Sequence, residues 1–458
     1  MPPVPIPGSF AALLFLLSPA FTAPSFETFS CLVVGFLARV GDHTVTGMLQ
    51  AARLERVWHH SRAHAFFAER KWSSDRLGLL LLDFLVARFV PAGEPIVLAV
   101  DDTLFKRRGK KVYGAAWQYD GSLPAGAGSQ KGYGNNWVVL TLVVRLPVTG
   151  RAVSLPVLMR LWQPDREAKR AKQAGKPRKL DPRYPSKSEL GRRMLDLVIR
   201  RYPGREIELL GDSAYATQHL RGLPERVTVT SRLRSNAALY APKPPRTGER
   251  GRPASKGARL ASLQAIANDP ATVWEQVEVV RSGKHHTVLC HVFEALWYDV
   301  WRDRPVRVVL VKRPTRKDDG YDIALVSTNM RANAQQIIER YDQRWSIEVC
   351  FEDARQITGV GEARNRVKNA VERTVPFGLL AQTLTITWYA LHGHADADVK
   401  RRRLNAPWYQ HKRSPSYHDM LASLRRELII AQYRTVTGSA PQPRQISQPT
   451  RRLEATAA

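Results

Sequence analysis

Apolar residues recur at intervals of three and four along about the first 90 residues, which is the spacing of one face of an α-helix. The clearest clusters lie at residues 29–37, 45–54 and 77–89. Short polar stretches separate these clusters. The pattern predicts an N-terminal helical domain over residues 1–92, with the content of a small helical bundle.

From residue 93 the pattern changes to short apolar runs with a helical segment among them. Continuous apolar runs are typical of strands buried on both faces of a sheet. The runs lie at residues 96–100, 136–144, 152–159, 206–210 and 227–231, and the helical segment lies at 186–201. The alternation predicts an α/β core, a mixed sheet with helices packed on its faces, whose first part covers residues 93–235.

Residues 236–330 interrupt this alternation. A stretch rich in Pro, Gly, Arg and Lys is followed by four strand-like runs, at residues 273–280, 287–292, 306–311 and 322–326. The pattern predicts an all-β insertion between two parts of the core.

A helical pattern begins near Asn333, which is a suitable N-cap, and it continues to Gly359, which favours a stop. This helix belongs to the second part of the core, expected at residues 331–395. The basic region that follows, residues 396–458, is predicted to end in a disordered tail rich in Pro, Gln and Arg from Pro441.

Two apolar segments invite comparison with signal or membrane sequences. No Lys or Arg precedes Arg39, so the segment Phe10–Leu17 lacks the positive flank of a secretory signal. The segment Val375–Leu391 carries Pro376, Gln382 and three threonines, and it is shorter than the ~20 apolar residues of a membrane span. Both segments are predicted to be buried helices, and no membrane span is expected.

The cysteines and the charge indicate the compartment and the partner. Cys31, Cys290 and Cys350 lack metal-ligand spacing and fit reduced, buried thiols of a cytosolic protein. Seventy Lys and Arg against 41 Asp and Glu give a net charge of +29, which favours a polyanionic partner, nucleic acid above all. The tract at residues 166–193 holds eleven basic and three acidic residues; it is either a phosphate-contacting surface or a solvated face.

Two acidic residues directly follow predicted strands. Asp101 follows the run at 96–100, and Asp212 follows the run at 206–210. Ligand sites of open α/β sheets lie outside the carboxyl ends of the strands, so both side chains can point into one crevice. Neighbouring carboxylates repel unless a cation lies between them, and Mg²⁺ favours such ligands. A strand-end turn acid is the alternative interpretation, and Asp102 competes with Asp101 for the role of ligand.

A third carboxylate lies on the predicted helix. Tyr341, Arg344, Glu348 and Arg355 are spaced to share one helix face, and Arg344 can pair with Glu348 four residues later. The alternative is a structural ladder of ion pairs. With three carboxylates, two ions about 4 Å apart could activate a water or a DNA 3′-hydroxyl and stabilise the leaving oxygen.

Together these residues resemble bacterial insertion-sequence transposases of the DDE, RNase H-like class, in the group with the YREK motif. Tyr341, Arg344 and Glu348 match that motif, and Arg355 stands where the motif has Lys. Asp101 with Thr103 resembles the first block of the family, and Asp212 with the following Ser-Ala-Tyr resembles the second. The resemblance covers residues 95–375 and is specific in combination.

The resemblance implies an RNase H-like fold and a two-metal DNA transposase. Asp101, Asp212 and Glu348 would be the catalytic residues and hold two Mg²⁺ ions, with Mn²⁺ as a substitute. Tyr341, Arg344 and Arg355 would hold DNA near the cut. The partners would be the element's inverted-repeat ends and target DNA, bound by a homodimer in the bacterial cytoplasm, in association with the nucleoid.

Other residues are weaker candidates. Lys106 and Arg107 could line a phosphate channel or form a solvated hairpin tip, and Glu352 is an alternative third ligand. In relatives an aromatic side chain from the β-rich insertion holds a flipped base; Trp297, Trp301 and Trp345 are the candidates here, with core packing as the alternative. Two other functions stay open: a nuclease of RNase H fold without strand transfer, and an inactive DNA-binding descendant.

Overall fold

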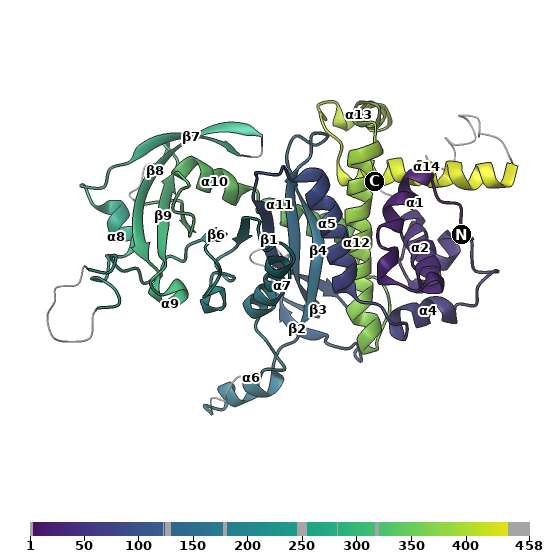
Figure 1. Cartoon of the computed structure of the whole chain (residues 1–458), viewed down its shortest axis with the longest axis horizontal. Helices are drawn as coiled ribbons and strands as arrows, with labels where there is room; N and C mark the ends of the chain where they lie inside the picture. The colour runs from purple at the N-terminus through teal and green to yellow at the C-terminus, as the bar shows by residue number, and fades with distance from the viewer. Residues whose placement is uncertain are drawn as a thin grey trace.

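The computed structural model describes residues 3–121, 123, 130–176, 181–244, 254–281, 283–316 and 320–437. Within these ranges the protein is a mixed α/β structure, as predicted, with a 10-stranded sheet along its long axis (Figure 1). The N-terminal helices and α14 lie at one end of the molecule, and β7, β8 and β9 lie at the other. The predicted disordered tail from Pro441 lies outside the described residues.

Five strands form the centre of the sheet in the order β4-β3-β1-β5-β6. β1 runs parallel to β5 and antiparallel to β3, while β5 is parallel to β6 and β3 is antiparallel to β4. This arrangement is consistent with an RNase H-like fold. The strands are β1 (Ile96–Lys106), β3 (Lys131–Arg145), β4 (Ala152–Trp162), β5 (Ile207–Gly211) and β6 (Val227–Arg232).

The other strands extend the same sheet at its edges. β10 pairs antiparallel with β6, so the strands of the predicted insertion continue the central sheet. The segment also contains two short helices, α8 (Leu263–Asn268) and α9 (Tyr298–Trp301), which its strand-like pattern did not predict. The added strands are β7 (Glu275–Arg281), β8 (Lys284–Leu296), β9 (Pro305–Lys312), β10 (Ile323–Ser327) and, next to β3, β2 (Ala116–Tyr119).

Four of the five N-terminal helices, α1, α2, α4 and α5, pack on the long helix α12 (Lys368–His392), and α3 packs on α2 and α4. The ring of Phe377 on α12 lies 5.2 Å from the ring of Phe67 and 5.9 Å from that of Phe29. α12 also lies on the sheet, where the Thr383 hydroxyl donates to the Pro156 carbonyl. One hydrophobic core therefore includes both the bundle and the sheet. The helices are α1 (Gly8–Phe15), α2 (Ala23–Ala38), α3 (Val45–Ala51), α4 (Ser61–Ala68) and α5 (Ser74–Phe89).

The remaining helices lie around the sheet and at the C-terminal end. Among the described residues no helix is long and apolar enough to cross a membrane. α6 projects away from the body of the protein and carries part of the basic tract (Figure 1). These helices are α6 (Arg166–Gln173), α7 (Lys187–Arg201), α13 (Ala395–Asn405) and α14 (Tyr417–Thr437), with 3₁₀ turns at Ser18–Ala20, Gln218–Leu220 and Pro407–Tyr409.

The prediction that β1 ends at Val100 is wrong. β1 continues to Lys106 because the long strand β3 pairs with it throughout, up to the partner pair Lys106 and Gly134. Pairing with β5 on the other side stops at Val100. Asp101 is therefore the first residue of β1 beyond the end of β5, inside a strand and beside an open edge.

The predicted single helix from Asn333 to Gly359 is two helices, α10 (Ala334–Asp342) and α11 (Trp345–Gln356). Asn333 caps α10 as predicted, in a capping box with Gln336. Between the helices the backbone tightens, since the Arg344 amide bonds to the Tyr341 carbonyl three residues earlier. Gly359 follows α11 with a positive φ of 71°, the conformation expected of a helix stop.

Gly78→Ala should destabilise the protein by about 1–3 kcal/mol, which is the usual cost of overpacking. A Cβ at residue 78 would lie 1.8 Å from the Val157 carbonyl oxygen, so α5 would have to move off β4. Gly8→Ala in α1 is the matched control, because a Cβ there meets nothing within 4 Å. Thermal unfolding of both variants measures the difference, and equal midpoints would show that α5 does not approach β4 this closely.

Candidate active site

Three acidic side chains from distant parts of the sequence lie beside β1, and we call the place between them the crevice. Asp101 lies on β1 where the pairing with β5 has ended, and Asp212 is the first residue after β5. Glu348 lies in the first turn of α11. The side chains of Asp101 and Glu348 are 19% and 34% exposed, so both are open to a substrate from one side only.

The guanidinium of Arg344 joins two of these acids. Its Nη1 lies 3.2 Å from the Asp101 Oδ2, and its Nη2 lies 2.6 Å from the Glu348 Oε1. Asp101 and Glu348 are thus separated by the width of one guanidinium. Arg344 itself is buried, with 9% exposure, and it begins α11 at the break after α10. The broken helix therefore places a cation between two carboxylates.

Asp212 lies close enough to Asp101 to disturb the ionisation of Asp101. Burial and then the charge of Asp212 raise the pKa of Asp101 to about 7, although Arg344 opposes the shift. An acid with this pKa retains a proton over much of the range in which most carboxyls are ionised. A cation near both oxygens would relieve the desolvation and the repulsion together.

Tyr341 completes the wall of the crevice next to Asp212. The Arg344 guanidinium carbon lies 5.6 Å from the centre of the Tyr341 ring. Burial raises the pKa of Tyr341, and the charge of Asp212 contributes to the same shift. The predicted stripe of Tyr341, Arg344 and Glu348 is therefore brought together at this crevice, across a helix break and not along one straight helix.

Asp102 faces the other side of β1, because successive strand residues point to opposite faces. Its Oδ2 accepts from the Lys187 Nζ at 2.6 Å and from the Asn136 Nδ2 at 3.0 Å, and its Oδ1 accepts from the Tyr215 hydroxyl at 3.1 Å. These partners satisfy the Asp102 carboxylate within the protein. This arrangement favours Asp101 over Asp102 as the acid available to a metal ion.

Arg355 lies further along the side of β1 that carries Asp101. Its guanidinium donates a hydrogen bond to the hydroxyl of Thr103, two residues after Asp101. Lys106, at the end of β1, has a largely exposed side chain and pairs with the buried Asp120 at 3.2 Å. Arg355 therefore lies near Asp101, whereas Lys106 is five residues further along β1 and points, by strand alternation, to the face of Asp102.

Arg107, in contrast, is part of the framework. It is 9% exposed, and its Nη1 donates to the Gly361 and Ala363 carbonyls at 2.7 and 2.6 Å. Its Nε donates to Asn135 at 2.9 Å. Burial lowers the pKa of Arg107 to about 10. These bonds tie the end of β1 to the loop after α11, and they occupy the guanidinium within the fold, which argues against the predicted contact with DNA.

The three candidate tryptophans lie in different surroundings. Trp297 and Trp301 are buried, at 5% and 4% exposure, and their rings pack edge to face at 5.5 Å. Trp345 is 58% exposed and directly follows Arg344. Glu352, the alternative third ligand, is exposed and accepts from Gln356 at 3.3 Å. Exposure thus leaves Trp345 as the aromatic accessible to a base.

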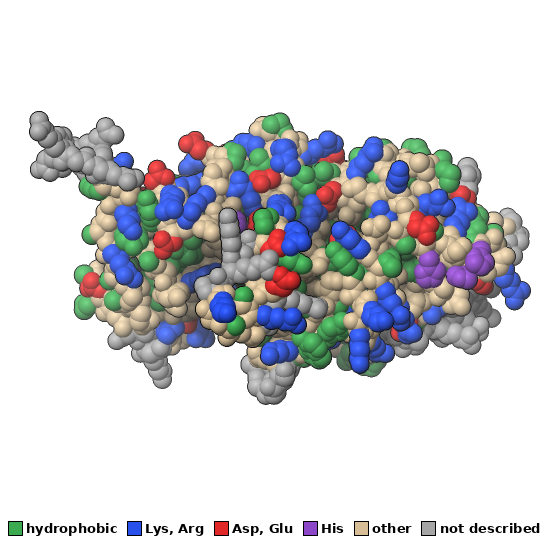
Figure 2. Space-filling model, turned by 90° about the horizontal axis from the view of Figure 1, so that it is seen from below, with side chains coloured by type: hydrophobic (Ala, Val, Ile, Leu, Met, Phe, Trp, Pro, Cys, Tyr) green, Lys and Arg blue, Asp and Glu red, His purple; other side chains and the backbone are tan. Residues whose placement is uncertain are grey.

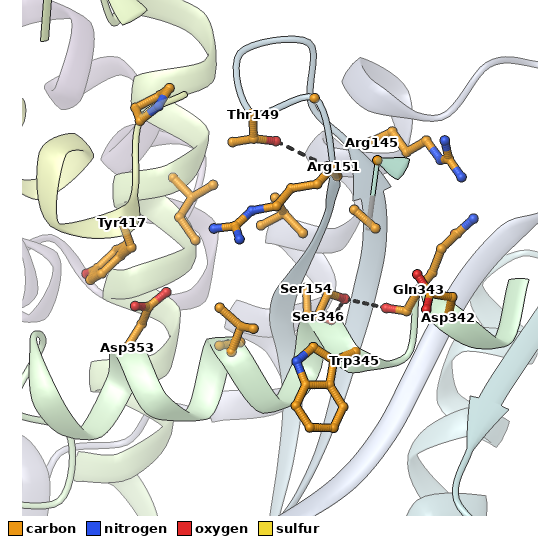
Figure 3. A pocket seen from close by; sticks show the side chains of 18 of the residues that line it. Arg145, Thr149, Arg151, Ser154, Asp342, Gln343, Trp345, Ser346, Asp353 and Tyr417 are labelled. Atoms are coloured by element: carbon orange, nitrogen blue, oxygen red, sulfur yellow. Dashed lines mark hydrogen bonds between the residues drawn. The ribbon is translucent and has the colours of Figure 1, made fainter. Parts of the chain in front are cut away.

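The opposite face of α11 borders a separate cavity of about 230 Å³ (Figure 3). Ser346 of α11 bonds there to Ser154 of β4, with 2.7 Å between the hydroxyl oxygens. Asp353 faces this cavity, and burial raises its pKa to about 7 while Arg151 opposes the shift. Glu348 does not line it, so α11 has an active-site face and a back face.

A family model decides the assignment. The model for the DDE superfamily endonucleases matches residues 16–303, more than half of the chain. The chain belongs to the DDE superfamily endonucleases. The matched range contains Asp101 and Asp212 and ends before α10 and α11. No curated protein matched the chain.

Membership implies a DNA substrate and an enzyme of the nuclease or transposase kind. Superfamily members generally use divalent metal ions. Among the described residues no group of three or more His, Cys, Asp or Glu is assembled tightly enough to hold an ion by itself. The chemistry of the crevice nevertheless fits a divalent cation, because Asp101 and Asp212 are hard oxygen donors that repel each other when both are ionised.

Residues without a local sequence signal complete the site. Lys187 neutralises Asp102, Asn136 and Tyr215 donate hydrogen bonds to it, and Asp120 pairs with Lys106. Lys187 lies 85 residues from its partner. Such partners become visible only when the sheet brings them together.

Asp101→Asn should stabilise the metal-free protein more at about pH 8 than at about pH 5. The folded pKa of Asp101, about 7, exceeds its ordinary value of 3.8. The folded state therefore binds an extra proton between these values, and stability falls as the pH rises through the window. Thermal unfolding in a chelator measures the gain. A gain that does not depend on pH would contradict the shifted pKa.

Asp353→Asn is the matched control, because burial raises the pKa of Asp353 to the same value. The gain in stability from Asp101→Asn should shrink when Mg²⁺ is added, since a bound cation stabilises the ionised parent. The gain from Asp353→Asn should stay the same.

Proposed function

We propose that this protein is a DNA transposase that cuts at the ends of its own insertion sequence and joins them to target DNA. The observation that carries the proposal is that Arg344 bridges Asp101 and Glu348, while Asp212 lies close enough to Asp101 to raise its pKa. Membership in the DDE superfamily endonucleases supports the same chemistry. The match of Tyr341, Arg344 and Glu348 to the YREK motif points to the insertion-sequence group.

Asp101, Asp212 and Glu348 would hold two divalent ions, Mg²⁺ or its substitute Mn²⁺. When bound, such ions activate a water or a DNA 3′-hydroxyl and stabilise the leaving oxygen of an in-line displacement. Before ions and DNA bind, Arg344 holds Asp101 and Glu348 in place, because its two ion pairs neutralise them. The half-buried crevice leaves these acids open on the side from which DNA approaches.

Cations on and beside β1 would position the DNA backbone. Arg355, bound to Thr103, and the exposed Lys106 both lie along β1 from Asp101. Arg344 and Tyr341 would contact the phosphate next to the cut. Figure 2 shows Lys and Arg side chains spread along one face of the protein, with acidic side chains among them. Phosphate contacts of this kind fix register without reading sequence.

The proposed cutting and joining of DNA also implies how the protein assembles on the DNA. Both ends of an element must be held together during cutting, so we expect a homodimer formed on DNA. The N-terminal helices, packed on α12 against the catalytic sheet, are the expected docking unit for the end sequence. Trp345, exposed at the start of α11 on the side of the back-face cavity, would stack on a displaced base that reaches this side of the helix, since unpaired bases bind to aromatic faces.

A nuclease of the same fold that cuts without joining is the second candidate, because the matching family is described as endonucleases. The two functions share the three acids. They differ in whether a freed 3′-hydroxyl attacks a second DNA. An element's gene is also flanked by inverted repeats and target duplications, which the nuclease would lack.

Asp212→Asn and Glu348→Gln should each abolish Mg²⁺-dependent cleavage of DNA carrying the element's ends, while end binding persists. Each change removes one charged ligand and keeps the size of the side chain. Glu352→Gln is the matched control, because Glu352 is exposed on the same helix and bonds only locally, to Gln356. Gel assays of cleavage and binding measure both effects. If Glu348→Gln cleaves as the parent does, the assignment fails.

Arg344→Ala should weaken binding to end DNA and reduce the dependence of affinity on salt by about one unit of slope. Loss of one phosphate contact releases one fewer counterion. Titrations of labelled end DNA at several salt concentrations, without divalent ions, measure the slope. Arg107→Ala provides the contrast, since Arg107 bonds to the Gly361 and Ala363 carbonyls and its loss should lower stability and leave the slope unchanged. An unaltered slope in Arg344→Ala would make that residue purely structural.

A further inference from the structure

The segment between α13 and α14 carries exposed aromatic side chains among cations. Residues 400–413 hold six Lys and Arg and no Asp or Glu. Trp408 is 73% exposed and Tyr409 is 47% exposed, and their ring centres are 6.3 Å apart. An exposed tryptophan in a charged turn contributes nothing to the core, and its ring is available to a ligand.

The framework beneath these rings is rigid. The Nε of Arg402 and the Nζ of Lys412 both bond to the buried carboxylate of Asp419, at 2.8 and 3.0 Å. The same two cations face the Tyr409 ring, at 6.0 and 5.7 Å from its centre. The two cations therefore fix the orientation of the Tyr409 ring. The Trp408 and Tyr409 rings form a fixed edge, which we call the Trp408 edge.

Other cations around this edge are free to meet a polyanion. Within the part of the chain that the structure describes, Lys400 and Arg413 form no ion pair with an acid, and both are exposed. A positive surface with aromatic faces is the combination that binds unpaired nucleic-acid strands, because cations attract the backbone and rings stack on bases. Duplex DNA hides its base faces and gains little from such rings.

The Trp408 edge lies at the far end of the catalytic helix. It borders a hollow of about 850 Å³ that Gln356 and Ile357 also line, directly after Arg355. Gln356 follows Glu348 by eight residues, which is about 12 Å along a helix axis. This distance corresponds to roughly three to four base-pair steps at 3.4 Å each. α13 and α14 both lie near one end of α12 (Figure 1).

We propose that the Trp408 edge stacks unpaired bases of the DNA strand that leaves the catalytic crevice past Arg355. This inference rests on the proposed DNA substrate, and it adds a second nucleic-acid contact outside the three acids and their cations. The edge would hold the strand that separates from its complement near the cut. Its contribution is selective for unpaired DNA, since stacking needs an accessible base face.

The test compares two labelled DNAs, a duplex with a short single-stranded overhang and the same duplex with blunt ends. Fluorescence anisotropy in a chelator measures binding without cleavage. Trp408→Ala should weaken binding of the overhang DNA about tenfold and leave blunt DNA unchanged. Trp408→Phe should restore most of the loss, because it keeps an aromatic face. The salt slope of Trp408→Ala should match that of the parent, since no charge is removed.

Leu404→Ala is the matched control, because Leu404 is 74% exposed on α13 and has no ring. It should bind both DNAs as the parent does. Equal affinity of Trp408→Ala and the parent for overhang DNA would overturn the inference. So would an equal loss on both DNAs, or a change in oligomeric state alone, which would make the edge a protein interface. Binding in a chelator separates this test from the cleavage test of the proposed function.

Discussion

The two ion pairs of Arg344 are the interaction on which the catalytic crevice depends. Burying carboxylates is costly unless a countercharge accompanies them. Arg344 supplies it to Asp101 and Glu348, while Asp212 has no share in these ion pairs and raises the pKa of Asp101. Without a metal ion, the negative charge of the crevice is therefore only partly balanced. Such a site gains most when a divalent cation arrives, because the cation relieves a repulsion that the fold already maintains.

The scaffold explains why three distant acids meet. β1 runs on beyond the end of β5, so its open edge places Asp101 beside Asp212. α11 then packs against β4 and β1, and the Gln382 Nε2 of α12 donates to the Cys350 carbonyl on the buried side of α11. α12 in turn is enclosed by the N-terminal helices. The position of Glu348 therefore depends on packing that extends from the sheet to the first residues of the chain.

Much of this arrangement could be predicted from local patterns. Apolar periodicity indicated the mixed α/β structure, and the cap at Asn333 and the stop at Gly359 were both confirmed. The continuation of β1 to Lys106 could not be predicted, because polar residues after Val100 end the apolar run and only pairing with β3 keeps the strand extended. The break between α10 and α11, just before Arg344, could not be predicted either, because the helical spacing of apolar residues continues through it.

The chemistry of single residues was harder to predict where partners are far apart in the sequence. Arg107 lies in a basic run that suggests phosphate contact, yet its guanidinium bonds to carbonyls more than 250 residues away. Asp101 and Asp102 are neighbouring residues of the same type, so the local sequence does not distinguish them. They differ because strand alternation turns one toward Arg344 and the other toward Lys187. Neither the structural role of Arg107 nor the difference between Asp101 and Asp102 could be predicted from the neighbouring residues in the sequence.

The most direct test of the central claim is a crystal structure of the protein bound to end DNA with Mn²⁺, using the metal's anomalous scattering. We expect two peaks bounded by the carboxylates of Asp101, Asp212 and Glu348, with Arg344 turned away from the acids toward a DNA phosphate. Peaks bound elsewhere, or an Arg344 that still bridges Asp101 and Glu348 in the DNA complex, would contradict the account.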